Sequence, residues 1–193
     1  MTRGCIARLL VSVMLASVLA SDPLAHSATT DTVAQDNAKA AHFTEVNWPF
    51  RIDEWGTGRA FHCRAADCGA EVSLYLRAKV GFCGCNDDVA DDDELERVAD
   101  LVLIGSNYTA LAHGQRTSMG SLRGLARSFL IKMPFTHPVP VMAIAINNGC
   151  DAVVATVVSN AGITPAVETA ARTFLNSDMP VKWALDNTGS QDP

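Results

Sequence analysis

The cysteines constrain the fold of this sequence more than any other feature. Six cysteines occur in 193 residues, and Cys5 lies in an N-terminal stretch with the pattern of an export signal. The other five are Cys63, Cys68, Cys83, Cys85 and Cys150. Exported proteins form disulfides from paired cysteines by default, and five cysteines cannot all pair within one chain. The sequence therefore predicts a disulfide-stapled domain with one cysteine left over, unless a bond joins two chains.

The N-terminal stretch has the order of a secretory signal. Two arginines without an acid precede an apolar run from Leu9 to Ala20, and Val18 and Ala20 present small side chains for cleavage. The run is shorter than the roughly 20 apolar residues that an ordinary membrane span needs. We expect a signal peptide over residues 1–20 and a periplasmic or secreted mature protein, with an uncleaved anchor as the alternative.

The net charge excludes two classes of partner. Removing the signal deletes two arginines and no acid, so the formal net charge changes from −6 to −8. Such a chain lacks the basic surface that nucleic acid requires and the Lys/Arg clusters that bind anionic membranes. We expect no nucleic-acid partner, no membrane contact after signal cleavage and no cofactor, which leaves a periplasmic protein as the partner class to consider.

Composition divides the mature chain into three parts. Residues 21–42 are polar without a periodic pattern, so we expect a flexible leader there, and residues 188–193 form a polar tail. Residues 43–187 are long and apolar enough for a single domain with a core. Near its start, Trp48 and Trp55 lie in a segment that we expect to be extended, with both tryptophans in the core.

A strand is predicted between Glu71 and Phe82, where apolar and polar residues alternate with a period of two. The buried face would comprise Val72, Leu74, Leu76, Ala78, Val80 and Phe82. The solvent-facing side would comprise Glu71, Ser73, Tyr75, Arg77 and Lys79, and Cys83 and Cys85 would follow on that side if the strand continues. Their Cα atoms would then be about 6.6 Å apart, at the limit for a disulfide. We therefore expect each to pair with another segment.

A short helix with an acidic start is predicted next. Asp91 and Glu94 have the spacing of a capping box, and acids are favoured at a helix N-terminus. Its apolar face would comprise Leu95, Val98, Ala99 and Val102. The segment from Gly114 to Met133 follows as turn and strand, and its arginines would form either a solvated strand face or an anion-binding patch.

The C-terminal third predicts a hairpin and a covering helix. Two apolar runs, 141–146 and 152–158, flank an Asn-Gly turn signal and would form central strands. Thr164 and Pro165 then start a helix with an apolar face that can cover the hairpin. These elements predict an α+β fold, in which an antiparallel sheet is covered by the C-terminal helix and accompanied by the short acidic-start helix.

The sequence leaves two disulfide pairings open. Cys63 and Cys68 can close a local loop, or they can bond separately to Cys83 and Cys85. Cys150 is our first choice for the unpaired thiol, and otherwise it is the partner of whichever cysteine remains.

Two functional alternatives use the same cysteines. A copper or zinc site would be built from His62, Cys63, Cys68, Cys83 and Cys85, because thiolates suit these metals. Their spacing matches no common zinc-finger or iron–sulfur pattern. A thiol redox role is the second alternative, although no C-x-x-C motif is present and strand parity directs His62 away from Cys63.

No enzyme motif is present, since the chain lacks a P-loop and a G-x-S-x-G elbow. The stretches Trp48–Val72 and Phe82–Cys85, with Gly149–Asp151 and the run Phe174–Ser177, resemble a family of small exported rhizobial proteins labelled nodulation formation efficiency C protein. The resemblance covers most of the mature chain. It implies a non-enzymatic role in efficient or competitive root-nodule formation, a symbiosis function, and it implies no ligand or catalytic residue.

Overall fold

The computed structural model describes residues 41–81, 89, 91–133 and 137–189, all within a compact unit that begins at Ala38. The predicted signal peptide, the leader up to residue 40, Cys83, Cys85 and residues 190–193 lie outside the described residues. Among the described helices, none combines the length and apolar character needed to cross a membrane.

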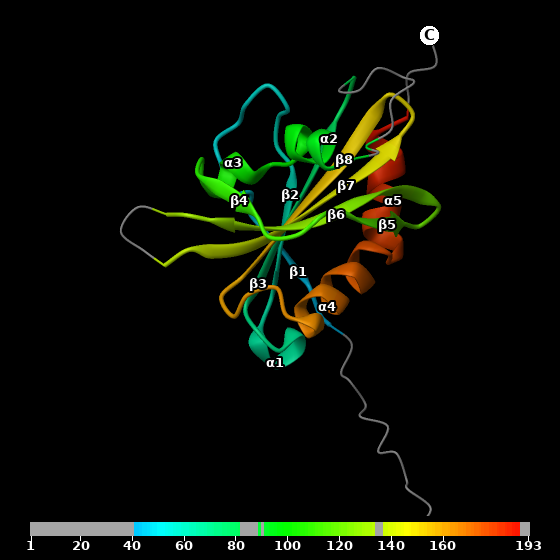
Figure 1. The fold of residues 1–193 in the computed structure, drawn as a ribbon. Coiled ribbons are helices and arrows are strands. Elements are labelled where there is room, and N and C mark those ends of the chain that lie inside the picture. Colours follow the sequence, from blue (N-terminus) through cyan, green and yellow to red (C-terminus); the bar gives the residue numbers. More distant parts are fainter. Residues whose placement is uncertain (1–40, 82–88, 90, 134–136, 190–193) are drawn as a thin grey trace, which may run out of the picture. The chain divides into compact units, whose positions relative to one another are not determined.

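The described residues form an antiparallel sheet of eight strands in the order β1-β2-β3-β8-β7-β6-β4, and β5 also pairs with β6 (Figure 1). The strands are β1 (Thr44–Val46), β2 (Arg59–Cys63), β3 (Val72–Lys79), β4 (Tyr108–Ala110), β5 (Gln115–Met119), β6 (Leu122–Ile131), β7 (Val139–Asn148) and β8 (Asp151–Ser159). The helices are α1 (Ala65–Cys68), α2 (Asp92–Val98), α3 (Leu101–Ile104), α4 (Pro165–Leu175) and α5 (Asp178–Asn187). The predicted α+β class is confirmed.

The apolar hairpin β7–β8 occupies the middle of the sheet, as its lack of a polar face predicts. Asn148 pairs with Asp151, so the two turn residues are Gly149 and Cys150, and Gly149 has a φ of 63°. The Asn-Gly signal therefore located the hairpin, but the turn is one residue later than the signal predicts, because Asn148 still pairs in the strand.

One face of the sheet is covered by α4 and α5. Thr164 caps α4 by accepting a hydrogen bond from the backbone N–H of Val167 at 3.3 Å, and Pro165 is the first helical residue. The buried side of α4 packs on the inner residues of β3, β7 and β8; its buried members are Val167, Ala170, Ala171 and Leu175. The covering helix is confirmed. A second helix, α5, follows directly and accommodates Pro180 within its first turn.

The other face is covered by α2, α3 and part of the loop between β1 and β2. Asp91 caps α2 through the backbone N–H of Glu94 at 2.9 Å, as the capping-box spacing predicts. The helix ends at Val98, and Val102 in α3 is 66% exposed. The prediction that Val102 continues the apolar face is therefore wrong, because the chain turns between the two helices.

The predicted orientation of β3 is only half correct. Val72, Leu74 and Leu76 are fully buried on the α4 side. The opposite face is not solvated along its whole length, since Arg77 and Lys79 are 2% and 5% exposed. The alternation of apolar and polar residues shows that β3 has two different faces. It does not show that the polar face is covered, because the covering segments come from elsewhere in the chain.

A buried carboxylate holds the segment that follows α5, at residues 188–189. Asp151 is 1% exposed and accepts hydrogen bonds from the backbone N–H groups of Gly81 and Gly189, both at 2.7 Å. Thr188 is also buried and accepts a hydrogen bond from Asn148. Thr188 and Gly189, which the sequence assigns to the polar tail, are therefore packed against the end of the sheet.

Candidate functional site

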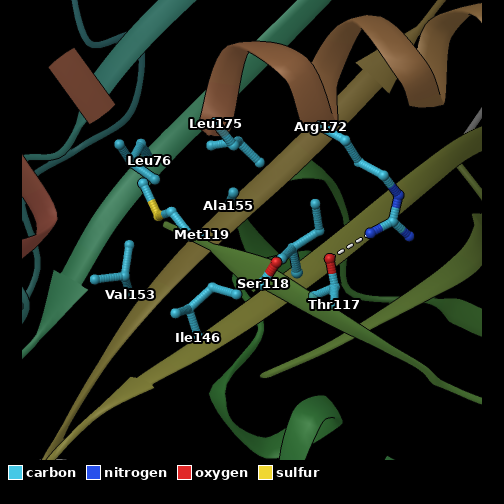
Figure 2. Close-up of a pocket in the computed structure, with 10 residues that line it drawn as sticks. Leu76, Thr117, Ser118, Met119, Ile146, Val153, Ala155, Arg172 and Leu175 are labelled. Carbon is cyan, nitrogen blue, oxygen red and sulfur yellow. Dashed lines mark hydrogen bonds between the residues drawn. The ribbon is translucent and has the colours of Figure 1, made fainter. Parts of the chain in front are cut away.

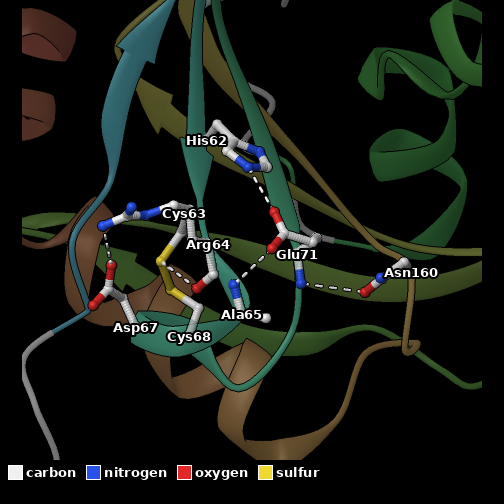
Figure 3. The surroundings of a disulfide bond; sticks show 8 residues. All are labelled: His62, Cys63, Arg64, Ala65, Asp67, Cys68, Glu71 and Asn160. Carbon is white, nitrogen blue, oxygen red and sulfur yellow. Dashed lines mark hydrogen bonds and ion pairs between the residues drawn. A yellow bond between two sulfur atoms is a disulfide. The ribbon is translucent and has the colours of Figure 1, made fainter.

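Cys63 and Cys68 form a disulfide with an S–S distance of 2.04 Å and a Cα–Cα distance of 6.0 Å (Figure 3). Cys63 is the last residue of β2 and Cys68 the last residue of α1, so the bond closes the single helical turn that follows the strand. Both residues are buried, at 0% and 4% exposure. The local-loop alternative is thus the one that the structure adopts.

His62 points to the opposite side of β2 from this disulfide, as strand parity predicts (Figure 3). Its Nε2 lies 2.7 Å from Oε2 of Glu71, whose Oε1 accepts the backbone N–H of Ala65 at 2.9 Å. The hydrogen bond from Ala65 is the main cause that lowers the pKa of Glu71, against a smaller opposing effect of desolvation. His62 therefore orders the β2–α1 turn and does not act as a base for Cys63.

Cys150 lies at the other end of the sheet. Cys150 comes just before β8, near the paired residues Ala152 and Lys79, whereas Cys63 pairs with Val72. Val72 and Lys79 are about 23 Å apart along β3, at about 3.3 Å per residue. Cys150 is itself disulfide-bonded. The prediction that Cys150 is the unpaired thiol is therefore wrong, and its alternative role as the partner of a remaining cysteine applies.

The disulfide also bears on the proposed metal ligands. A bonded sulfur is not a thiolate, so Cys63 and Cys68 cannot both serve as copper or zinc ligands in this state. Within the part of the chain that the structure describes, no cluster of three or more His, Cys, Asp or Glu side chains has the arrangement of a metal site.

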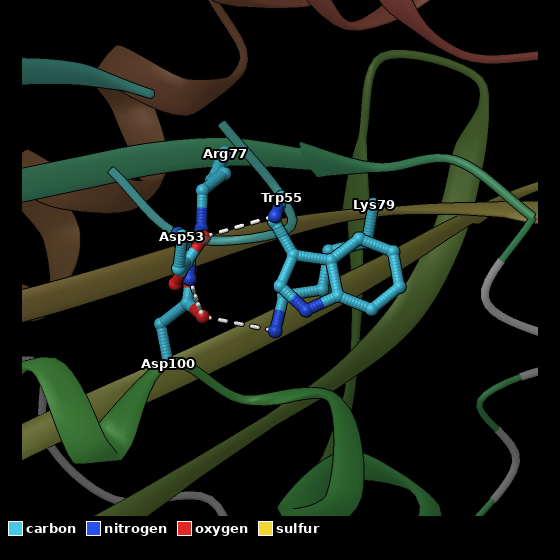
Figure 4. Close-up of polar contacts among 5 residues, drawn as sticks. All are labelled: Asp53, Trp55, Arg77, Lys79 and Asp100. Carbon is cyan, nitrogen blue, oxygen red and sulfur yellow. Dashed lines mark hydrogen bonds and ion pairs between the residues drawn. The ribbon is translucent and has the colours of Figure 1, made fainter. Parts of the chain in front are cut away.

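A buried charge cluster is the main polar feature that the sequence did not predict (Figure 4). Arg77 donates to Asp100 from Nε at 2.8 Å and from Nη2 at 2.5 Å. Lys79 Nζ lies 2.9 Å from the same carboxylate. Asp53 accepts two hydrogen bonds from Arg77 Nη1, at 2.8 and 2.9 Å. Two cations and two carboxylates thus join β3, the start of α3 and the β1–β2 loop.

The charges in this cluster stabilise one another against burial. Desolvation by itself would lower the pKa of Arg77, but the hydrogen bonds and charges of Asp100 and Asp53 outweigh it, so the pKa is raised. Desolvation by itself would raise the pKa of Asp53. The hydrogen bonds from Arg77 and Trp55, together with the charges of Arg77 and Lys79, outweigh this effect, so the pKa is lowered. Asp100 was detectable in the sequence as one acid within the apolar run Val98–Ile104.

A second polar group lies where the edge of the sheet is interrupted. Strands β4 and β5 both pair with β6, and residues 111–114 bulge outward between them. Asp92 holds the bulge by accepting the backbone N–H of Gly114 at 2.6 Å, and its other oxygen lies 2.9 Å from Nδ1 of His113. The hydrogen bond from His113 is the largest of several effects that lower the pKa of Asp92.

Arg127 completes this group from the neighbouring strand. It donates from Nη1 to Glu96 at 2.5 Å and from Nε to the carbonyl of Ala112 at 2.6 Å. Arg127 is therefore engaged by the protein itself and is not available to an anion-binding patch, whereas Arg116 and Arg123 of the same segment are exposed. The side chain of His113 is 98% exposed beside an open hollow of about 400 Å³, whose lining includes three acids and Arg116. No nucleophile among the described residues bonds to it.

The enclosed space under α4 is too small for a ligand (Figure 2). The cavity measures about 10 Å³, which is near the minimum for one water molecule. Its walls are apolar except near Thr117, whose hydroxyl accepts a hydrogen bond from Arg172. A larger open groove of about 620 Å³ lies between α1 and α4 and is lined mainly by small side chains.

Comparison with known proteins adds no assignment, since no family model matches the chain and no curated protein matches it.

Proposed function

We propose that this chain is an exported, non-enzymatic protein that supports efficient or competitive root-nodule formation. The nodulation role rests on the resemblance to the nodulation formation efficiency C protein family. Export and a structural role of the cysteines are supported by one observation, namely that Cys63, Cys68 and Cys150 are all disulfide-bonded. Disulfides persist in the periplasm and outside the cell and are rare in the cytosol.

The burial of Cys63 and Cys68 supports a structural role for their bond. A catalytic or redox-sensing cysteine needs solvent access and a stabilised thiolate, and these two residues are 0% and 4% exposed. The same bond weighs against the copper or zinc alternative, which requires both sulfurs as thiolates. The protein would then act by binding a periplasmic or extracellular protein.

A deletion strain of the source bacterium tests this proposal on the roots of its legume host. We expect fewer nodules, or poor competition against the parent strain in mixed inoculation. Complementation with the full chain should restore nodulation, and a chain that lacks residues 2–20 should fail to restore it because it is not exported. Parental nodule number together with parental competitiveness in the deletion strain would contradict the proposal.

A further inference from the structure

The loop between β1 and β2, residues 47–58, crosses the face of β3 that carries the buried cations. Its outer part is exposed from Arg51 to Glu54, and Ile52 is 72% exposed. Besides Trp48, three of its side chains make inner contacts. Phe50 packs edge-on against Tyr75 at 4.8 Å, Trp55 lies 5.3 Å from Lys79 Nζ, and Asp53 binds Arg77.

Arg77 is bound from two sides that differ in character. Nε and Nη2 face Asp100, which is 4% exposed and belongs to the body of the domain. Nη1 directs both of its hydrogen bonds at Asp53, whose side chain is 33% exposed and belongs to the loop. The half of the guanidinium that faces the loop is therefore neutralised only while the loop is closed.

The loop also presents Asp53 in a fixed position. A backbone hydrogen bond from Gly56 to the carbonyl of Asp53 closes a turn at 3.0 Å, and the N–H of Trp55 donates to Oδ1 of Asp53 at 2.9 Å. Opening of this turn would remove one carboxylate from a guanidinium that is 2% exposed. A buried cation that loses its partner is strongly destabilised, so the open state favours binding of a replacement anion.

We propose that Asp53 is an internal carboxylate ligand of Arg77, and that opening of the β1–β2 loop frees a site that binds the carboxylate of an external ligand. Both oxygens of Asp53 lie within 2.9 Å of the single nitrogen Nη1, so a ligand that replaces Asp53 there would present a carboxylate to the same nitrogen. Trp48, whose ring lies 5.8 Å from the Arg77 guanidinium, would line one side of the site. The site is independent of the nodulation role.

Acetate serves as the probe, added against chloride at constant ionic strength. In Asp53→Ala the loop carboxylate is missing, so 100 mM acetate should raise Tm by about 3 °C if it binds the native state with a Kd of about 10 mM. Wild-type protein, whose site is filled by Asp53, should show no such rise. The double variant Asp53→Ala/Arg77→Met keeps the vacancy but lacks the cation, and it should also show none.

Trypsin cleavage after Arg51 reports opening of the loop. Asp53→Ala should be cleaved about tenfold faster than wild-type protein, because cleavage follows the population of the open form. Glu54→Ala, which removes an exposed acid next in sequence, is the matched control and should be cleaved at the wild-type rate. Equal rates for Asp53→Ala and Glu54→Ala would show that Asp53 does not hold the loop closed.

Wild-type protein provides a test that holds even if Asp53→Ala fails to fold. Acetate, but not chloride, should accelerate cleavage after Arg51, because an external carboxylate competes with Asp53 for Arg77. A cleavage rate that acetate leaves unchanged would overturn the proposal. So would a Tm rise in Asp53→Ala that persists after Arg77 is replaced by methionine, since the acetate would then bind elsewhere.

Discussion

Removal of the Cys63–Cys68 bond is the perturbation whose effect the structure defines most sharply. A sequence separation of five encloses a loop of six residues, and the loop-closure relation then gives about 2.2 kcal/mol at 25 °C. Both residues are buried, so alanine is the appropriate replacement, because serine would bury a hydroxyl group. Loss of the two packed sulfurs adds about 1 kcal/mol, for a total of about 3 kcal/mol.

Urea denaturation followed by tryptophan fluorescence measures this loss. With an m-value of about 2 kcal/mol/M, the midpoint of Cys63→Ala/Cys68→Ala should fall by about 1.5 M. Each single variant already lacks the bond, so each should lose nearly as much as the double variant. Single losses that add up to the double loss would indicate packing alone. A double variant within about 0.5 kcal/mol of wild-type protein would refute the structural role of this disulfide.

Three further predictions concern a buried carboxylate, a tightly packed glycine and two carboxylates with lowered pKa values. Asp100→Asn should lower the free energy of unfolding by about 3 kcal/mol in the same urea assay, because it leaves two buried cations short of a carboxylate; a loss below about 1 kcal/mol would show that the cluster is not stabilising. Gly124→Ala would place a Cβ 1.8 Å from the carbonyl oxygen of Ala145, so β6 and β7 must separate at a cost of about 3 kcal/mol, which thermal unfolding would detect as a large fall in Tm. The pKa values of Asp53 and Asp92 are lowered in the fold, so the unfolded chain binds more protons in acid. Their contribution to stability should be full above about pH 5 and should decline as the pH falls below about 4 toward the folded-state pKa values; urea midpoints that stay constant from pH 5 to pH 3 would contradict this.

Local patterns in the sequence were sufficient to predict the elements whose residues interact with near neighbours. The cap of α4 at Thr164 and the cap of α2 at Asp91 depend on contacts three residues away, and both were predicted correctly. The central position of β7 and β8 followed from their uninterrupted apolar composition, because such strands must be covered on both sides.

Features that depend on distant segments were not predictable in this way. Alternation assigned Arg77 to a solvated face, and only the approach of Asp53 and Asp100 from separate segments explains its burial. The bulge at residues 111–114 likewise depends on Asp92, which lies about 20 residues earlier in the chain. No local period encodes either contact.

The candidate site was predicted in part. Five cysteines left several pairings open, and the structure resolves the one between Cys63 and Cys68 because β2 and α1 bring their Cα atoms within 6.0 Å. Parity correctly separated His62 from Cys63. The pairing of Cys150 could not be predicted, because it depends on which segment approaches the β7–β8 turn.

The state of the cysteines in protein purified from the periplasm decides whether they are structural disulfides or metal ligands. Peptide mapping under non-reducing conditions, thiol titration and metal analysis can be carried out on one preparation. We expect a Cys63–Cys68 linked peptide, a disulfide at Cys150 and no stoichiometric copper or zinc. Free thiols at Cys63 and Cys68 together with one equivalent of either metal per chain would contradict this expectation.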